Sequence, residues 1–124
     1  MMSTELHFTK EHEWVKLEGG KAYVGVTDHA QKLLGDIVFV DLPEVGSKLS
    51  RGGVLGTIES VKTVSDVFAP VSGTVVEVNT ELEDSPALVN SNPYDSFLAV
   101  LELSDETELK DLLDEAQYLA LCKE

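Results

Sequence analysis

Lys62 is the residue of this chain best placed to take a covalent modification. It lies in a short polar connection, residues 60–63, between two apolar runs that predict the strands of a hairpin. It is also the only base between Arg51 and Lys110, an interval that holds 11 acidic residues. An amide formed on a turn lysine would carry a cargo on a long, flexible stem. The alternative is an exposed lysine that only balances neighbouring acids, and spacing alone favours this second interpretation.

The other side chains suited to chemistry are three histidines and one cysteine, and they predict no catalytic or metal site. His7, His12, His29 and Cys122 show neither the order of a nucleophile with its base nor the ligand spacing of a zinc site. A single cysteine allows no intrachain disulfide, and its place near the end of the chain favours a buried or incidental thiol. We therefore expect neither a stand-alone enzyme nor a metal protein.

The charge of the chain is strongly negative and unevenly distributed. Nine bases against 23 acids give a formal net charge of −14, which argues against nucleic acids and anionic membrane surfaces as partners. Residues 81–124 alone hold 2 bases and 12 acids. This excess forms either a solvated face that favours solubility or a docking surface for a partner with a basic mouth.

Length and composition predict one domain over residues 1–124. The 124 residues, 43% of them hydrophobic, suffice for a single modest core. No apolar run approaches the roughly 20 residues that span a bilayer. The first seven residues lack the basic and apolar blocks of a signal or transit peptide.

The elements that must position Lys62 are mostly short strands. Apolar runs between turn signals predict strands at 14–17, 22–26, 37–40, 54–58, 64–68, 74–78 and 97–103. A cap at Thr27 and a stop at Gly35 predict a short helix over 29–34, and Pro86 predicts a helical turn over 85–89. A weak similarity between 35–40 and 73–78 suits a sandwich of two related sheets.

The C-terminal segment predicts a single amphipathic helix that begins after Ser104 and Asp105. Its apolar positions fall on one face, which is typical of a helix packed on a core. These positions are Leu109, Leu112, Leu113, Ala116, Leu119 and Ala120.

The residues around Lys62 resemble the lipoylation site of the glycine cleavage H-protein family. The matching positions are Glu59, Ser60, Val61, Lys62 and Asp66, followed by the run APVSG at 69–73. Further matches are HEWV at 12–15, GVTDHAQ at 25–31, LGDIVFVDLP at 34–43, Pro86, Asn90, Pro93, Tyr94 and the segment 103–113. The resemblance covers about residues 8–122. The resemblance therefore favours a modified Lys62 over an exposed lysine that only balances neighbouring acids.

The fold implied by this resemblance is mainly β, a barrel-sandwich hybrid of the lipoyl- and biotinyl-carrier type. Two antiparallel sheets would be accompanied by short peripheral helices and a C-terminal helical segment at about 104–122. Lys62 would lie at a hairpin tip, in agreement with the strand pattern.

The function implied is that of a non-catalytic lipoyl carrier, with lipoate in amide linkage on Lys62. The aminomethyl group of glycine would pass from glycine decarboxylase (P protein) to a tetrahydrofolate-dependent aminomethyltransferase (T protein). Dihydrolipoyl dehydrogenase (L protein) would then reoxidise the carrier, and a lipoyl-attaching enzyme would modify it beforehand. The family is consistent with a monomer in the bacterial cytoplasm or, for a mature eukaryotic chain, in the mitochondrial matrix.

The family also implies a cleft that shelters the loaded arm, and its positions match Glu13, His29 and Asp66 here. A carboxylate can bind the ammonium of the arm through a charge-assisted hydrogen bond. For His29 alone, helix capping or packing is the alternative. One departure lies at 95–98, where the chain has DSFL in place of glycines and a tryptophan; Phe97 is expected to replace the packing of that tryptophan.

Two other carriers share the main features. A donor protein for lipoylation of 2-oxo acid dehydrogenases would carry the same motif. A biotin carrier would place its lysine between methionines, whereas Val61 and Thr63 flank Lys62.

Overall fold

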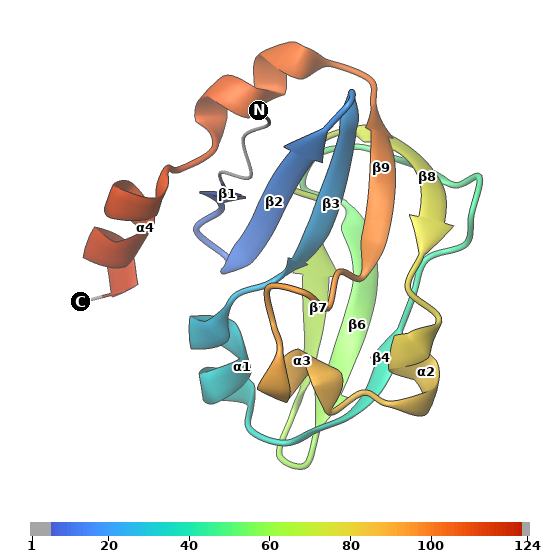
Figure 1. Ribbon diagram of the computed structural model, residues 1–124, viewed down its shortest axis with the longest axis vertical. Coiled ribbons are helices and arrows are strands. Elements are labelled where there is room, and N and C mark those ends of the chain that lie inside the picture. Colours follow the sequence, from blue (N-terminus) through green and yellow to red (C-terminus); the bar gives the residue numbers. More distant parts are fainter. Residues whose placement is uncertain (1–5, 123–124) are drawn as a thin grey trace.

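Two antiparallel sheets form the body of the molecule in the computed structural model, which describes residues 6–122 (Figure 1). The six-stranded sheet consists, in spatial order, of β1 (Leu6–Phe8), β2 (Glu13–Glu18), β3 (Lys21–Val26), β9 (Ala99–Leu103), β8 (Gly73–Val78) and β5 (Lys48–Leu49). The three-stranded sheet consists of β4 (Ile37–Asp41), β6 (Val54–Ser60) and β7 (Val64–Phe68). The mainly β fold of two antiparallel sheets is confirmed, and the described strands form no closed barrel.

Short helices lie at the ends of these strands. They are α1 (Asp28–Leu34), α2 (Glu81–Asp84), α3 (Leu88–Ser91), the 3₁₀ helix η1 (Glu106–Asp111) and α4 (Glu115–Cys122). The helical turn expected at 85–89 therefore lies slightly later, in α3, and α2 was not expected. No helix in residues 6–122 has the length and apolar character needed to cross a membrane.

The core lies between the two sheets. Ala22, Val24 and Val26 alternate along β3 with their side chains buried, as expected for a strand with one face on a core. From the smaller sheet, Val40 and Ile58 are buried in the same apolar cluster. Burial of a side chain of this size contributes about 1.5–3 kcal/mol each, so the core holds the two sheets together.

The local signals around α1 act as expected. The hydroxyl of Thr27 accepts a hydrogen bond from the backbone N–H of Ala30 at 3.2 Å and caps the helix. Gly35 ends it with φ 82° and ψ −157°, a conformation essentially restricted to glycine. The chain is thereby turned directly into β4.

The expectation of one continuous C-terminal helix is wrong. The backbones of Phe8 and Leu113 form a two-bond bridge, with N···O distances of 2.8 and 2.7 Å. In a continuous helix the backbone N–H and C=O of Leu113 would form hydrogen bonds within the helix and could not pair with Phe8. A new helix starts just afterwards, where Asp114 accepts from the N–H of Gln117 at 2.8 Å and the Gln117 side chain accepts from the N–H of Asp114 at 2.9 Å.

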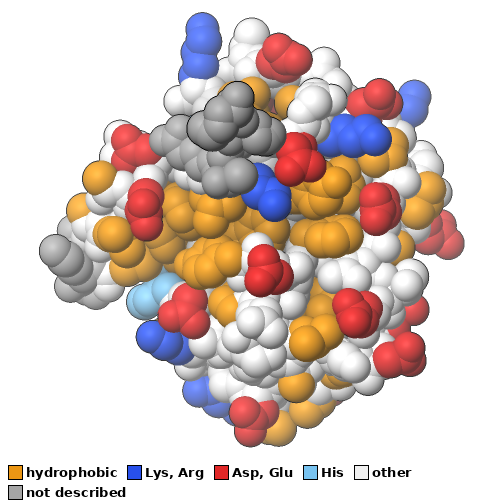
Figure 2. Space-filling model, viewed as in Figure 1, with side chains coloured by type: hydrophobic (Ala, Val, Ile, Leu, Met, Phe, Trp, Pro, Cys, Tyr) orange, Lys and Arg blue, Asp and Glu red, His pale blue; other side chains and the backbone are white. Residues whose placement is uncertain are grey.

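The face presented by α4 also differs from the predicted stripe. Tyr118 is buried and stacks on Phe8 with ring centroids 4.6 Å apart, whereas Leu119 is 51% exposed. Figure 2 shows hydrophobic side chains gathered over β2, β3 and β9, beside α4. Phe97 packs against a second apolar cluster, formed by Phe8, Trp14 and Tyr118, and its ring lies edge-on to that of Tyr23 with centroids 5.3 Å apart. Phe97 thus has aromatic neighbours, and its replacement of the family's tryptophan stays a prediction.

Candidate functional site

Lys62 lies in the connection between β6 and β7, which projects at the lower end of the molecule in Figure 1. The turn is closed by a backbone hydrogen bond from the N–H of Ser60 to the carbonyl of Thr63 at 2.8 Å. The buried Ser60 hydroxyl oxygen accepts from the N–H groups of Lys62 and Thr63 at 3.3 and 3.1 Å. A single serine therefore holds the backbone at the turn while the lysine side chain is exposed.

The hairpin tip is also attached to the segment that follows α1. Val61 donates its N–H to the carbonyl of Asp36 at 3.0 Å. A Cβ placed on Gly35 would lie 3.4 Å from Cε of Lys62, so the lysine side chain passes over this glycine. Asn90 supports the same segment, since it accepts from the N–H of Ile37 and donates to the carbonyl of Gly35, both at 2.9 Å.

A cavity of about 180 Å³ lies next to this point, between α1 and the strands of the hairpin. Its apolar lining consists of Val26, Ala30, Leu33, Leu34, Ile58 and Val67. Its polar lining consists of Glu11, His12, Glu13, Ser65 and Asp66. An apolar wall with carboxylates at one side suits a ligand that has an alkyl part and a cationic end. Leu34 lines the cavity and precedes Gly35, so the cavity lies close to the lysine side chain.

Glu13 is the most buried acid of the site, at 2% exposed. One carboxylate oxygen accepts from the Thr9 hydroxyl at 2.7 Å and the other from the N–H of Phe68 at 3.0 Å. Burial raises the pKa of the Glu13 carboxyl, while these two hydrogen bonds lower it in part. An ionised carboxylate has about four acceptor positions, so two remain for a ligand.

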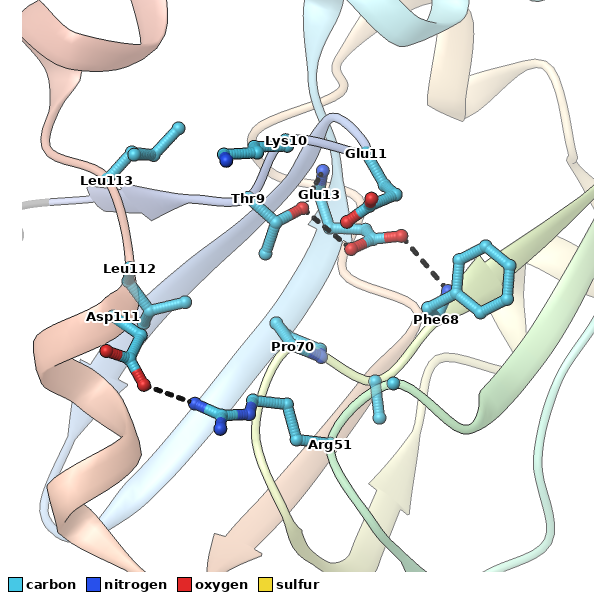
Figure 3. A pocket seen from close by; sticks show the side chains of 12 residues that line it. Thr9, Lys10, Glu11, Glu13, Arg51, Phe68, Pro70, Asp111, Leu112 and Leu113 are labelled. Carbon is cyan, nitrogen blue, oxygen red and sulfur yellow. Dashed lines mark hydrogen bonds and ion pairs between the residues drawn. The ribbon is translucent and has the colours of Figure 1, made fainter.

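A second and larger cavity, about 550 Å³, adjoins the first and shares Glu11 and Glu13 with it. Figure 3 shows Glu13 bonded to Thr9 and Phe68 on one side of this cavity. An ion pair between Arg51 and Asp111, 2.6 Å long, crosses its other side. Glu13 therefore lies at the boundary between the two cavities.

The structure brings Glu13 and Asp66 to one cavity but places His29 beyond its lining. The His29 ring packs against that of His12, with centroids 4.7 Å apart, and His12 does line the cavity. Burial and the neighbouring His29 lower the pKa of His12, and Glu11 opposes them. The role of His29 in the cleft stays a prediction.

Several residues that shape the site were not predicted from the sequence. Thr9 and Phe68 hold Glu13, and the backbone of Phe68 rather than its side chain makes the bond, so no residue type marks it. Asn90 matched a family position but had no assigned task. Its three hydrogen bonds reach Gln31, Gly35 and Ile37, all far away in sequence.

The surface around Lys62 is unusually apolar. Val61 and Val64 are 69% and 64% exposed, and Phe39 and Leu33 are about half exposed or more. Phe39 pairs with Glu59 and Glu59 with Val64 across the three-stranded sheet, so an acid lies between two exposed apolar residues. Exposed apolar patches rimmed by charge are typical of protein interaction sites.

Comparisons with known proteins cover nearly the whole chain. The family model for the glycine cleavage H-protein matches residues 6–124. The glycine cleavage system H protein of Brevibacillus brevis is 57% identical over 120 residues, which is 96% of this chain and 95% of that protein. The protein of the same name from Thermoanaerobacter sp. (strain X514) is 54% identical over 113 residues, 91% of this chain and 90% of its own.

A crystal structure gives the same picture. A glycine cleavage system H protein from Mycobacterium marinum superposes with a TM-score of 0.84 at 39% sequence identity. The match covers 96% of this chain and 97% of that one. Sequence and fold therefore point in the same direction.

Proposed function

Because the chain belongs to the glycine cleavage H-protein family, the lipoyl carriers of the glycine cleavage system, we propose that it carries its lipoyl group on the Nζ of Lys62. The observation that carries this proposal is the exposed lysine at a hairpin turn held by Ser60. A rigid turn presents the amine to a lipoyl-attaching enzyme. Glu59, Ser60, Val61 and Asp66 are proposed as the recognition motif, with Ser60 acting through the backbone.

The cofactor is proposed to be lipoate, and the residues near Lys62 fit it. Attached to Lys62, it would supply a dithiolane for aminomethyl transfer from glycine decarboxylase to the aminomethyltransferase, with dihydrolipoyl dehydrogenase as the enzyme that restores its oxidised form. In this proposal the chain acts as a carrier, and the partner enzymes supply the catalytic groups for these steps. Its task is to hold the arm and to let it move between partners.

The 180 Å³ cavity is proposed as the shelter of the loaded arm. Its apolar wall would bind the alkyl part of the arm and restrict the access of water. The carboxylates of Glu13 and Asp66 would bind the terminal ammonium. His29 remains a candidate through its contact with His12, which forms part of the wall.

The apolar surface of Val61, Val64, Phe39 and Leu33 is proposed to contact the partner enzymes when they reach Lys62. The surrounding acids would favour partners with basic rims and would speed their encounter. Transient docking of this kind suits a small monomer that meets several enzymes in turn. The bacterial relatives favour the cytoplasm as its compartment.

Intact-mass measurement of protein expressed with its lipoyl-attaching enzyme and lipoate tests the assignment. We expect one added lipoyl group in the wild type and none in Lys62→Arg, which keeps the positive charge. Lys48→Arg, on the exposed edge strand β5, is the matched control and should be lipoylated normally. A lipoyl group that persists in Lys62→Arg would refute the site.

A further inference from the structure

Three side chains that commonly bind metals converge between α4 and α1. They are His12, His29 and Cys122, whose ligand atoms all lie within 4.8 Å of one another. Each is half-buried, so an ion could reach the cluster from solvent. Figure 2 shows histidine at the surface in this region, next to α4. The cluster joins the start of β2, the start of α1 and the end of α4.

His12 is held in place more firmly than an ordinary surface histidine. It is the one non-glycine residue with positive φ in the described range 6–122, at 71°. Its Nδ1 lies 2.7 Å from the Tyr118 hydroxyl, which in turn lies 2.6 Å from the Thr27 hydroxyl. Metal-binding histidines are commonly oriented by such a partner on the nitrogen that does not bind the metal. The free nitrogen of His12 is then Nε2.

We propose that His12, His29 and Cys122 bind a divalent transition-metal ion, with zinc as the best fit. Two imidazoles and a thiolate are a donor set that zinc accepts in tetrahedral geometry, and the fourth position would be open to water. Magnesium and calcium prefer oxygen ligands and do not fit. On binding, the Cys122 thiol would release its proton to solvent, because the thiolate is the ligand.

The present separation of the ligand atoms is close to what coordination needs. Bond lengths of about 2.0–2.3 Å place tetrahedral ligands on the order of 3.5 Å apart. Small side-chain rotations would close the difference, since Cys122 lies in the last turn of α4. The bound ion would attach α4 to α1 and so add to the contact of Tyr118 with Phe8.

Cobalt titration of the reduced, metal-free, full-length chain, with Lys62 unmodified, tests the proposal. We expect one ion per chain, a thiolate-to-cobalt charge-transfer band and the intense visible bands of a tetrahedral ion, all abolished when zinc displaces cobalt. Zinc at about 100 times its Kd should raise Tm by about 10 °C, and a chelator should reverse this. Absence of the charge-transfer band at one equivalent of cobalt would overturn the proposal.

Variants identify the ligands. Cys122→Ser should abolish the charge-transfer band, and His29→Gln should weaken cobalt binding at least tenfold. His12→Asn should do the same, because asparagine tolerates a positive φ and should preserve the local backbone. His7→Gln, on β1 and outside the cluster, is the control and should bind as the wild type does. A band that persists in Cys122→Ser, or wild-type affinity in both histidine variants, would refute the site. These readouts need no lipoyl group, so they stand apart from the proposed function.

Discussion

Replacing Glu13 with glutamine tests the proposed shelter for the loaded arm. The substitution keeps the shape of the side chain but removes its charge. The glutamine carbonyl can still accept from the N–H of Phe68, and its amide can donate to the Thr9 hydroxyl, which at present donates to Glu13 at 2.7 Å. Because both contacts survive in neutral form, we expect a loss of only about 1 kcal/mol in the free energy of unfolding. Tm should fall by about 2–8 °C.

The effect on the loaded arm should be larger than the effect on the fold. A hydrogen bond to a charged group contributes about 1.5–3 kcal/mol, roughly a tenfold to hundredfold change in an equilibrium. Loss of the carboxylate should therefore reduce the sheltered fraction of the arm at least about tenfold. Lipoylation should be unchanged, because the hydrogen bonds of Glu13 go to Thr9 and Phe68 and not to the hairpin turn that presents Lys62.

The assay follows the lifetime of the aminomethylated carrier. Lipoylated protein is loaded with glycine by the decarboxylase, separated from it, and followed by mass spectrometry. We expect much faster decay in Glu13→Gln than in the wild type. Glu102→Gln, which removes the same charge from an exposed position on β9, should decay as the wild type does. An unchanged lifetime in Glu13→Gln would remove Glu13 from the binding site of the arm.

Three further substitutions test how the hairpin tip is held. Ser60→Ala removes the acceptor shared by two turn N–H groups, so it should lower the free energy of unfolding by about 1 kcal/mol and slow lipoylation. An unchanged rate of enzymatic lipoylation would show that the turn needs no such support. Gly35→Ala places a side chain at φ 82° and should lower the free energy of unfolding by about 1–3 kcal/mol in urea titrations, so a stable variant would contradict the described backbone. Asn90→Ala breaks three hydrogen bonds and should lower the free energy of unfolding by about 2–3 kcal/mol in the same titrations. A decrease below about 1 kcal/mol would show that water replaces these bonds.

The parts of the fold that follow from short-range patterns were predictable. The expected strand over 64–68 has the same bounds as β7, because the apolar residues and the flanking turns that predicted it lie within a few residues of one another. The helix α1 was likewise marked at both ends, by Thr27 and Gly35. The C-terminal helix was predicted wrongly because its break depends on Phe8, more than a hundred residues earlier in the chain.

In the candidate site, too, local features were predictable from the sequence and contacts made by packing were not. The position of Lys62 between two apolar runs is a local feature, so the pattern of residues alone predicts that it lies on a turn. The meeting of Glu13 with Asp66 in one cavity depends on how β2 faces β7, and their spacing in sequence carries no sign of it. His29 is the converse case. It matches a cleft position of the family, but it does not line the cavity.

The amino-acid sequence by itself determined the acidic character of the chain, its run of short strands and the exposed lysine on a turn. These properties depend on composition and on neighbours within a few residues. Only the tertiary structure decided that Glu13 is buried and hydrogen-bonded to Phe68, and that the side chains of His12, His29 and Cys122 lie close together. Such contacts arise when sheets and helices pack, and packing joins residues whose separation along the chain has no fixed period.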